Sequence, residues 1–498
     1  MNHDPHRPTI HFTPPANWMN DPCGLVWHDG VFHLYYQHNP HENRWGPMHW
    51  GHAVSEDLFH WRDRPIALFP DDVHGMAFTG SAVVMPPGGT RKSAEEVQSA
   101  ADRSPGSLCA IYTGALPQES AHSTLQQQCV ATSADGERWT PRGVVIANPG
   151  IADFRDPKVG RHPGTGGWYL VLAAGDHVQF FSSPDLERWQ YESSFGHGLG
   201  YTEGEWECPN LFQLPLPDDG VRWVLVVHAG RGLSNRHAGA QYITGDFDGK
   251  RFHPIEGDFR PVDHGHDFYA AQSWSGTEER RIWIAWASHW AHSDLPQTQG
   301  WAGTMTLPRE LSLAMSTTGV VELHQRPVRE FIDLIEHELR PVSDQSRRPD
   351  DTDEPHSSLT ADSSTIASWA TDGTAAYRIA TRSTEPTSFR VLLRFANAGA
   401  VTIERTPSTL RVDRGACDMG SFSTRIDTDK TVPLASPYGT VEIIFDHSIL
   451  EVFVDGGSTV TTDLLFPRER LSQIGYAVER GAAPGVCTVH ALRRSIHR

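Results

Sequence analysis

The sequence predicts an all-β protein in which a β-propeller is followed by a β-sandwich. Short runs rich in Val, Ile, Phe, Tyr and Trp recur between Gly, Pro, Asp and Asn, as strands joined by turns do. A turn-like motif also returns at irregular intervals in the first half of the chain. Irregular spacing excludes a tight solenoid and fits propeller blades, which are four-stranded sheets joined by loops of variable length.

The first predicted element is a β-hairpin. Residues 25–36 read LVWHDGVFHLYY, so two apolar runs flank Asp29 and Gly30. Asp-Gly is favoured in a two-residue type I′ turn because both central residues need a positive φ. This stretch is therefore predicted to form two antiparallel strands near the start of the propeller.

The recurring motif has the pattern S-x-D-x-x-x-W. Three copies centre on Asp57, Asp135 and Asp185, and a looser relative contains Asp246. Each copy is predicted to be a turn between two strands, with the aromatic side chain packing back on its sheet. Residues 86–107 are polar and rich in small residues, and we predict a long surface loop there.

One helix and a linker are predicted to separate the two domains. Five apolar side chains at residues 328, 331, 332, 335 and 339 fall on one helical face. A Pro-, Asp- and Ser-rich stretch, residues 340–358, follows. Beyond it the strand pattern resumes with FRVLLRF, GTVEIIFD and ILEVFVDGG, which is typical of a β-sandwich. The expected boundaries are 1–326 for the propeller, 327–357 for the helix and linker, and 358–498 for the sandwich.

The charge balance limits the partners. Lys and Arg total 42 against 61 Asp and Glu, a formal net charge of −19. Nucleic acid and anionic membranes favour clustered basic residues, so neither is expected as a partner. There is no run of about 18 apolar residues, so no transmembrane helix is predicted. A neutral partner such as a sugar fits this balance, and the sequence carries no signal for an oligomeric state.

Cysteine and histidine usage predicts neither a metal nor a cofactor. The six cysteines include no CxxC, and both disulfides and free thiols fit their even number; Cys109 and Cys129 could lie on neighbouring strands. The densest histidine cluster, residues 263–267, lacks helical ligand spacing. The start, MNHDPHRPTI, is polar and is not a signal peptide. We expect a secreted protein whose signal has been removed, with an intracellular location as the alternative.

Three acidic motifs stand out. Asp21 lies in WMNDP, Asp156 in FRDP and Glu207 in WECP, and a proline follows each acid at the first or second position. Proline fixes φ and removes a donor, so it helps to fix the direction of the neighbouring acid. Each motif alone also fits a structural turn or a packing role. The occurrence of all three motifs, in this order, on an all-β chain predicts that the three acids meet where the inner strands of a propeller converge.

Glycoside cleavage needs such a set of carboxylates. One carboxylate attacks the anomeric carbon while a protonated acid gives its proton to the departing oxygen, and in retaining enzymes the two are about 5 Å apart. Burial and a second carboxylate help to keep the acid protonated. A third acid can hold sugar hydroxyls in the transition state, and Arg155 could keep Asp156 ionised.

These motifs resemble glycoside hydrolase family 32, the group of invertases, inulinases and levanases. The resemblance runs from Asn17 to about Pro467 and includes YYQHNP, WGPMHWGHA, FTGSA, HGHDFYAAQ, WAGTMTLPREL and DHSILEVFVDGG. It implies a five-bladed propeller joined to a β-sandwich, with Asp21 as nucleophile, Asp156 as transition-state stabiliser and Glu207 as acid/base. The substrate-binding positions that it implies are Asn20, Gln37, Trp45, Phe78, Ser81, Arg155, Asp267 and Trp301.

Two positions depart from the family pattern. Cys23 replaces a usual asparagine, and Asn210 replaces a frequent aspartate. We interpret both as changes to the pocket that affect which hydroxyl group accepts the fructosyl unit. The expectation is therefore a levan fructotransferase, in which a hydroxyl of the departing disaccharide attacks and a difructose anhydride forms. The alternative is an exo-acting β-fructofuranosidase, levanase or invertase that transfers fructose to water.

Two further alternatives remain. Five-bladed propeller glycosidases that act on arabinan or xylan also use three acids, but the motifs WMNDP, FRDP and WECP speak against them. A non-catalytic fructan-binding protein would tolerate the loss of an acid, whereas this chain has all three. Release of reducing sugar from levan, inulin, sucrose and arabinan would discriminate these classes.

Overall fold

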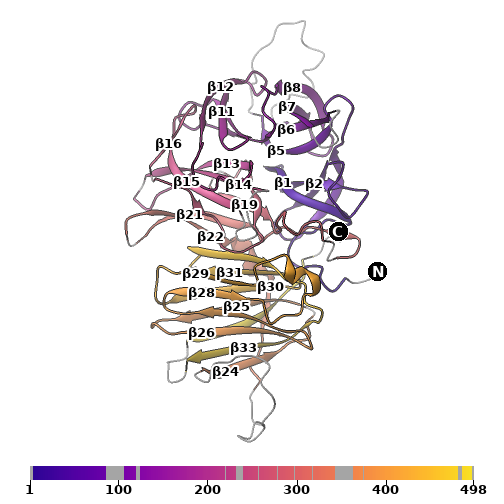
Figure 1. Ribbon diagram of the computed structural model, residues 1–498. Coiled ribbons are helices and arrows are strands. Elements are labelled where there is room, and N and C mark those ends of the chain that lie inside the picture. Colours follow the sequence, from indigo (N-terminus) through magenta and orange to yellow (C-terminus); the bar gives the residue numbers. More distant parts are fainter. Residues whose placement is uncertain are drawn as a thin grey trace, which may run out of the picture.

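The computed structural model describes most of the chain as five sheets arranged in a ring, followed by two stacked sheets (Figure 1). None of the described helices has the length and hydropathy of a membrane-spanning helix. The residues that the structure describes are 4–85, 106–118, 124–218, 220–230, 239–255, 257–277, 279–295, 298–316, 318–342, 363–373, 375–479 and 485–495. Most of the loop predicted at 86–107 and most of the linker predicted at 340–358 lie outside these ranges, which omit residues 86–105 and 343–362.

Each blade of the ring is an antiparallel sheet with its strands in chain order. The first blade contains β1 (Asn17–His28), β2 (Val31–Asn39), β3 (His49–Ser55) and β4 (Arg62–Leu68). The second contains β5 (Met76–Val84), β6 (Leu108–Pro117), β7 (Thr124–Ser133) and β8 (Thr140–Ile146). The third contains β9 (Phe154–Arg161), β10 (Trp168–Ala174), β11 (Val178–Ser183) and β12 (Gln190–Phe195).

The last two blades complete the propeller. The fourth contains β13 (Trp206–Pro215), β14 (Val221–Ala229), β15 (Ala240–Phe247), β16 (Phe252–Pro254) and β17 (Arg260–Pro261). The fifth contains β18 (Tyr269–Ser273), β19 (Ile282–Trp286), β21 (Arg309–Met315) and β22 (Val321–Pro327). The short strand β20 (Trp301–Ala302) pairs in parallel with β1. The first strand of each blade contacts the first strand of the next blade, in the order β1, β5, β9, β13 and β18. Strand β18 also contacts β1, so the ring closes.

The hairpin and turn predictions are confirmed. Asp29 and Gly30 connect β1 to β2 with φ values of 49° and 81°, as a type I′ turn requires. The repeated motif connects the third and fourth strands of a blade: Asp57 Oδ1 accepts the backbone N–H groups of Phe59 and His60. In the fourth blade this role belongs to Asp248, whose Oδ1 accepts two backbone N–H groups, so the alignment on Asp246 was wrong.

All five first strands contain an extra residue at the same level, and β1 has a second register shift between Cys23 and Val26. The pairing with the second strand shifts within residues 19–22, 77–80, 155–158, 207–210 and 269–272. Such β-bulges bend a strand and redirect its side chains. Three of these bulges contain a non-glycine residue in the left-handed region, namely Asp156 (φ 66°), Cys208 (φ 47°) and Ala270 (φ 55°). The three acidic motifs therefore lie at matching positions around one axis.

The C-terminal domain is a two-layer β-sandwich. One sheet has the order β23 (Ile335–Glu338), β34 (Val486–Leu492), β25 (Ala376–Ser383), β30 (Gly439–Asp446), β31 (Ile449–Val454) and β32 (Thr459–Leu464). The other has the order β24 (Ser363–Ala370), β33 (Leu471–Glu479), β26 (Phe389–Phe395), β27 (Gly399–Arg405), β28 (Thr409–Asp413) and β29 (Asp429–Pro433). Apolar side chains from both sheets form the core between the layers, and a 3₁₀-helix, η3 (Gly420–Thr424), follows β28.

The predicted helix between the domains is shorter than expected. The structure has a six-residue 3₁₀-helix, η2 (Arg329–Leu334), and Ile335 begins strand β23, which pairs with β34. Phe331 and Leu334 are buried, but Ile332 is 66% exposed. The apolar spacing predicted a helix that extends too far. The backbone hydrogen-bonding groups of residues 335–338 pair with β34 of the sandwich instead of continuing the helix.

A buried charge network joins the propeller to the sandwich. Arg309, on β21, bonds Asp263 at 3.1 Å and Glu451, on β31, at 2.9 Å. His11 lies between two sandwich carboxylates, with Nδ1 at 2.8 Å from Asp446 and Nε2 at 3.2 Å from Glu451. All five side chains are buried. Buried charges need such partners, so the domains are held in one arrangement.

The domains also touch through their backbones. A Cβ on Gly265 would lie 2.1 Å from the Thr462 carbonyl oxygen, so only glycine fits there. The two ends of the described chain meet at this junction, where Ser495 N donates to Thr9 O (Figure 1).

All six cysteines are free thiols, including Cys109 and Cys129 on the neighbouring strands β6 and β7.

Candidate active site

The three acidic motifs meet in one pocket at the axis of the propeller. Its volume is about 630 Å³, and Asp21, Asp156 and Glu207 all line it. They come from the first strands of blades one, three and four, at the bulges described above. Chain segments far apart in sequence are therefore brought together by the ring, as the sequence predicted.

Asp21 is almost fully buried and held at both oxygens. Oδ1 accepts a hydrogen bond from Asn20 Nδ2 at 3.1 Å, and Oδ2 accepts one from Thr79 Oγ1 at 2.8 Å. Burial and the charge of Glu207 raise the pKa of Asp21 to about 6, and the hydrogen bonds oppose this rise. Asp21 is thus a fixed carboxylate that is ionised above about pH 6.

Asp156 and Asp21 share the thiol of Cys208. Cys208 Sγ lies 3.4 Å from Asp21 Oδ2 and 3.5 Å from Asp156 Oδ2, and the backbone N–H of Cys208 donates to the same Asp156 oxygen at 2.9 Å. Burial raises the pKa of Asp156; Arg155 opposes this, while Glu207 and Asp21 raise it further. Two carboxylates that line the pocket therefore converge on one buried thiol.

Glu207 is held by Arg155 and Tyr269. Arg155 donates to Oε1 through Nε at 3.2 Å and Nη2 at 2.9 Å, and the Tyr269 hydroxyl donates a short hydrogen bond to Oε2. Arg155 also bonds Asp153 and Gln126. Nearby carboxylates, Glu207 first, raise the pKa of Arg155 well above its usual value against the effect of burial, so its charge is permanent.

The walls of the pocket are aromatic and amide side chains. Among the residues predicted to bind substrate, five line it: Asn20, Gln37, Trp45, Phe78 and Arg155. Trp45 is 42% exposed, and its ring lies 6.1 Å from that of Phe78, so the two form an aromatic rim. Trp290 completes the lining on the side of the fifth blade. A pocket with aromatic rings at its rim and polar side chains below them can bind a sugar, whose ring has apolar faces and hydroxyl groups at its edge.

Two predicted substrate contacts lie outside the pocket lining and have other partners. The Ser81 hydroxyl donates to Pro157 O and accepts from Val159 N, so it ties blade two to blade three. Asp267 is fully buried at the domain junction, where its carboxylate bonds His292 at 2.6 Å and Leu464 N at 2.7 Å. The structure therefore gives both side chains structural partners and places neither in the pocket lining.

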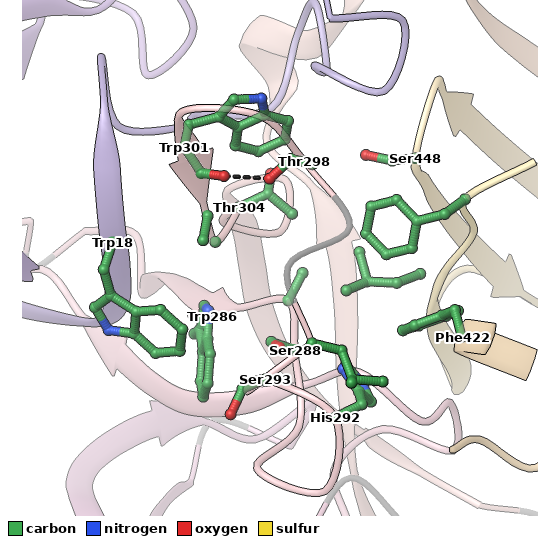
Figure 2. A pocket seen from close by; sticks show the side chains of 16 residues that line it. Trp18, Trp286, Ser288, His292, Ser293, Thr298, Trp301, Thr304, Phe422 and Ser448 are labelled. Carbon is green, nitrogen blue, oxygen red and sulfur yellow. Dashed lines mark hydrogen bonds between the residues drawn. The ribbon is translucent and has the colours of Figure 1, made fainter. Parts of the chain in front are cut away.

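Trp301 lies in a separate, smaller cavity of about 50 Å³ between the propeller and the sandwich. Figure 2 shows Trp301 facing this space together with Trp18 and Trp286 of the propeller and Phe422 of the sandwich. The indole N–H of Trp301 donates to Asp4. Trp301 thus packs at the junction, outside the lining of the main pocket.

Cys23 and Asn210 do not line the pocket either. Cys23 is fully buried in an apolar cluster with Tyr35 and Trp50. Asn210 is also fully buried, and its Oδ1 accepts a hydrogen bond from Ser273 Oγ at 3.2 Å. Because both side chains are packed in the interior, the pocket lining gives no support to the expectation that these two residues reshape the acceptor site.

Sequence reasoning missed Tyr269, Thr79 and Cys208 as parts of the site. Tyr269 lies two residues after Asp267 in HGHDFYAAQ, the motif from which the family resemblance implies only Asp267 as a substrate contact. Thr79 lies between Phe78 and Ser81 in FTGSA. Strand pairing reveals them, because the bulges place these residues at the same level as the three acidic motifs.

The fold and the site define a class of glycoside hydrolase, and the comparisons agree. The N-terminal domain of Glycosyl hydrolases family 32 matches residues 11–327, and the C-terminal domain of the same family matches residues 338–492. The chain belongs to glycoside hydrolase family 32.

Similar proteins cover the whole described architecture. A levanase of Bacillus subtilis (strain 168) is 37% identical over 98% of this chain and 71% of its own length. A levanase of Bacillus sp. (strain L7) is 32% identical over 98% of this chain, which spans about half (52%) of that relative. Among solved structures, an exo-inulinase from Aspergillus awamori has a TM-score of 0.81 at 26% identity, covering 99% of both chains. A fructofuranosidase from Schwanniomyces occidentalis complexed with fructose has a TM-score of 0.79 at 26% identity, covering 99% of this chain and 98% of its own.

Proposed function

We propose that this chain is an exo-acting, retaining β-fructofuranosidase that releases terminal fructose from levan-type fructans. The observation that supports this most is the meeting of Asp21, Asp156 and Glu207 at one end of the propeller axis, in a pocket rimmed by aromatic rings. Membership of family 32 supports the fructosyl class of substrate.

In the proposed reaction Asp21 is the nucleophile. Its carboxylate attacks C2 of the terminal fructosyl unit, and the bond from C2 to the leaving oxygen breaks. Glu207 gives that oxygen its proton, and a covalent fructosyl-enzyme remains. Glu207 then takes a proton from water, which attacks C2 and releases fructose and the free Asp21 carboxylate.

Asp156 and Arg155 have supporting roles in this proposal. Asp156 faces the same thiol as the nucleophile, so it can accept hydrogen bonds from sugar hydroxyls as positive charge develops on the ring. Arg155 keeps Glu207 and Asp153 fixed at the wall. Preorganised groups of this kind stabilise a transition state without having to reorganise.

Hydrolysis is preferred over intramolecular transfer. The expectation of transfer depended on Cys23 and Asn210 as pocket residues, and neither lines the pocket. The similar levanases and the exo-inulinase support exo-hydrolysis of a fructan, with levan as the first choice. A polymer such as levan is met outside the cell, so we include secretion in the proposal.

The proposal is tested by incubating the purified chain with levan, inulin, sucrose and arabinan and separating the products. Free fructose should appear from levan, and Asp21→Asn should abolish it. Asp246→Asn, on the exposed face of strand β15, is the matched control and should retain full activity. A cyclic difructose from levan would instead establish transfer. Binding of levan with no product from any polymer would establish a fructan-binding protein.

A further inference from the structure

A cluster of one carboxylate and two imidazoles lies on the third blade, outside the catalytic set. Asp176 and His177 form the turn between β10 and β11, and His197 follows β12. Nδ1 of His177 lies 3.1 Å from Asp176 Oδ1, and Nδ1 of His197 lies 3.0 Å from the same oxygen. The two rings stack with centroids 3.8 Å apart.

We propose that Asp176, His177 and His197 form a binding site for a divalent transition metal ion such as Zn²⁺. The three donor atoms all lie within 4.8 Å of one another. Zinc binds imidazole nitrogen and carboxylate oxygen at about 2.0 to 2.2 Å, which places neighbouring donors of a tetrahedral site about 3.3 Å apart. Two of the three donor separations already match this spacing to within a few tenths of an ångström.

The donor set selects the class of ion. Imidazole nitrogens favour Zn²⁺, Ni²⁺ and Cu²⁺, whereas Ca²⁺ and Mg²⁺ favour sets made of oxygen alone. Three protein ligands leave one position of a tetrahedral site for water. Asp176 and His197 are each 59% exposed at the side chain, so an ion can enter from solvent, while His177 is mostly buried and anchors the site.

A second histidine-acid cluster offers a useful contrast. His266, Asp267 and His292 are equally close together, but all three are buried. The guanidinium of Arg414 lies 3.9 Å from Asp267, and Leu464 N donates to the same carboxylate. A cation would have to displace these partners, so this cluster is an internal ion-pair network.

The proposed metal site adjoins the wall of the catalytic pocket. Gly175, next to Asp176, donates its N–H to Asp153 O at 2.8 Å and accepts a hydrogen bond from the N–H of Trp206. Asp153 lines the pocket, and Trp206 precedes Glu207. A bound ion would tie the β10–β11 turn to the segment of His197 beside this wall.

Calorimetric titration of the full chain with ZnCl₂ tests the site, and the visible absorption of bound Co²⁺ reports its ligands. One saturable Zn²⁺ per chain is expected. His197→Ala and Asp176→Asn should each weaken binding at least tenfold while leaving the melting temperature of the metal-free protein within a few degrees. His60→Ala is the matched control, because His60 forms a similar surface pair with Asp57, and it should bind as wild type does. Absence of saturable binding, or undiminished binding in both variants, would overturn the proposal and leave the cluster as an ion pair.

Discussion

The hydroxyl of Tyr269 donates a hydrogen bond to Oε2 of Glu207, while Arg155 donates to the other carboxylate oxygen. Both oxygens of the proposed acid/base are therefore fixed by groups from neighbouring blades. Tyr269 is itself almost fully buried, so it has little freedom to move away. The direction in which Glu207 can deliver a proton is set by these two partners.

Tyr269→Phe should lower kcat for levan or sucrose by about 10- to 100-fold. Its hydrogen bond stabilises the negative charge that develops on Glu207 as the proton leaves, and a hydrogen bond to a charged group contributes roughly 1.5 to 3 kcal/mol. A substrate with an activated leaving group needs little protonation and should lose much less. Steady-state kinetics on both substrates measure the difference. Equal losses on the two would show that Tyr269 does not act through the proton donor.

Thr79→Val should move the acid limb of the pH profile to higher pH. In the proposed mechanism Asp21 must be ionised to attack, so activity should fall as the pH drops through about 6, the raised pKa of Asp21. The Thr79 hydrogen bond stabilises the ionised form and lowers that pKa, so its loss should shift the limb upward by about one unit. Profiles of kcat/KM measure the shift, and an unmoved or lowered limb would contradict it.

Asp156→Asn should reduce kcat by a larger factor than it raises KM. The motivation is the position of Asp156 beside Asp21, the proposed nucleophile, with an oxygen that both the thiol and the backbone N–H of Cys208 fix. An interaction that strengthens in the transition state lowers kcat when it is lost, whereas a uniform binding contact raises KM alone. A change confined to KM would reduce Asp156 to a residue that only positions the substrate.

His11→Gln should destabilise the protein more at pH 6 than at pH 9.5. Burial alone would lower the pKa of His11, but the hydrogen bonds and charges of Asp446 and Glu451 raise it to about 9. Its stabilising charge is therefore complete below the ordinary pKa of 6.5 and is lost as the pH rises through about 9. The difference corresponds to about 3 kcal/mol.

Urea midpoints of wild type and His11→Gln at the two pH values measure this dependence. His253→Gln, with an exposed side chain on β16, is the control and should be nearly neutral at both. A cost for His11→Gln that is the same at pH 6 and pH 9.5 would mean that the imidazole is uncharged at the junction.

The local signals in the sequence were sufficient for much of the fold. The Asp-Gly turn at residues 29 and 30 and the S-x-D-x-x-x-W turns depend on neighbours within a few residues, so a single sequence contains what determines them. The three acids were found because each lies in a short motif whose proline is local. The helix after Val328 was overestimated, because pairing of Ile335–Glu338 with β34 involves residues that are far away in the chain.

The remaining parts of the site depend on contacts across blades. Nothing near Tyr269 in the sequence indicates that its hydroxyl reaches Glu207, which lies on another blade. Cys23 is adjacent to the nucleophile motif, yet the bulge in β1 turns it into the core beside Tyr35. Whether a residue of a β-bulge faces the axis or the interior follows from strand pairing, and a motif alone does not contain that information.

The most direct test of the mechanism is to locate the covalent intermediate. In Glu207→Gln, a fructosyl donor with a fluoride leaving group should still react with Asp21, since that leaving group needs no acid, but water would lack its base. The fructosyl-enzyme should then accumulate, and peptide mass spectrometry should place one fructosyl unit on Asp21. An adduct on any other residue, or release of fluoride with no adduct in the folded variant, would contradict the assignment of Asp21 as the nucleophile.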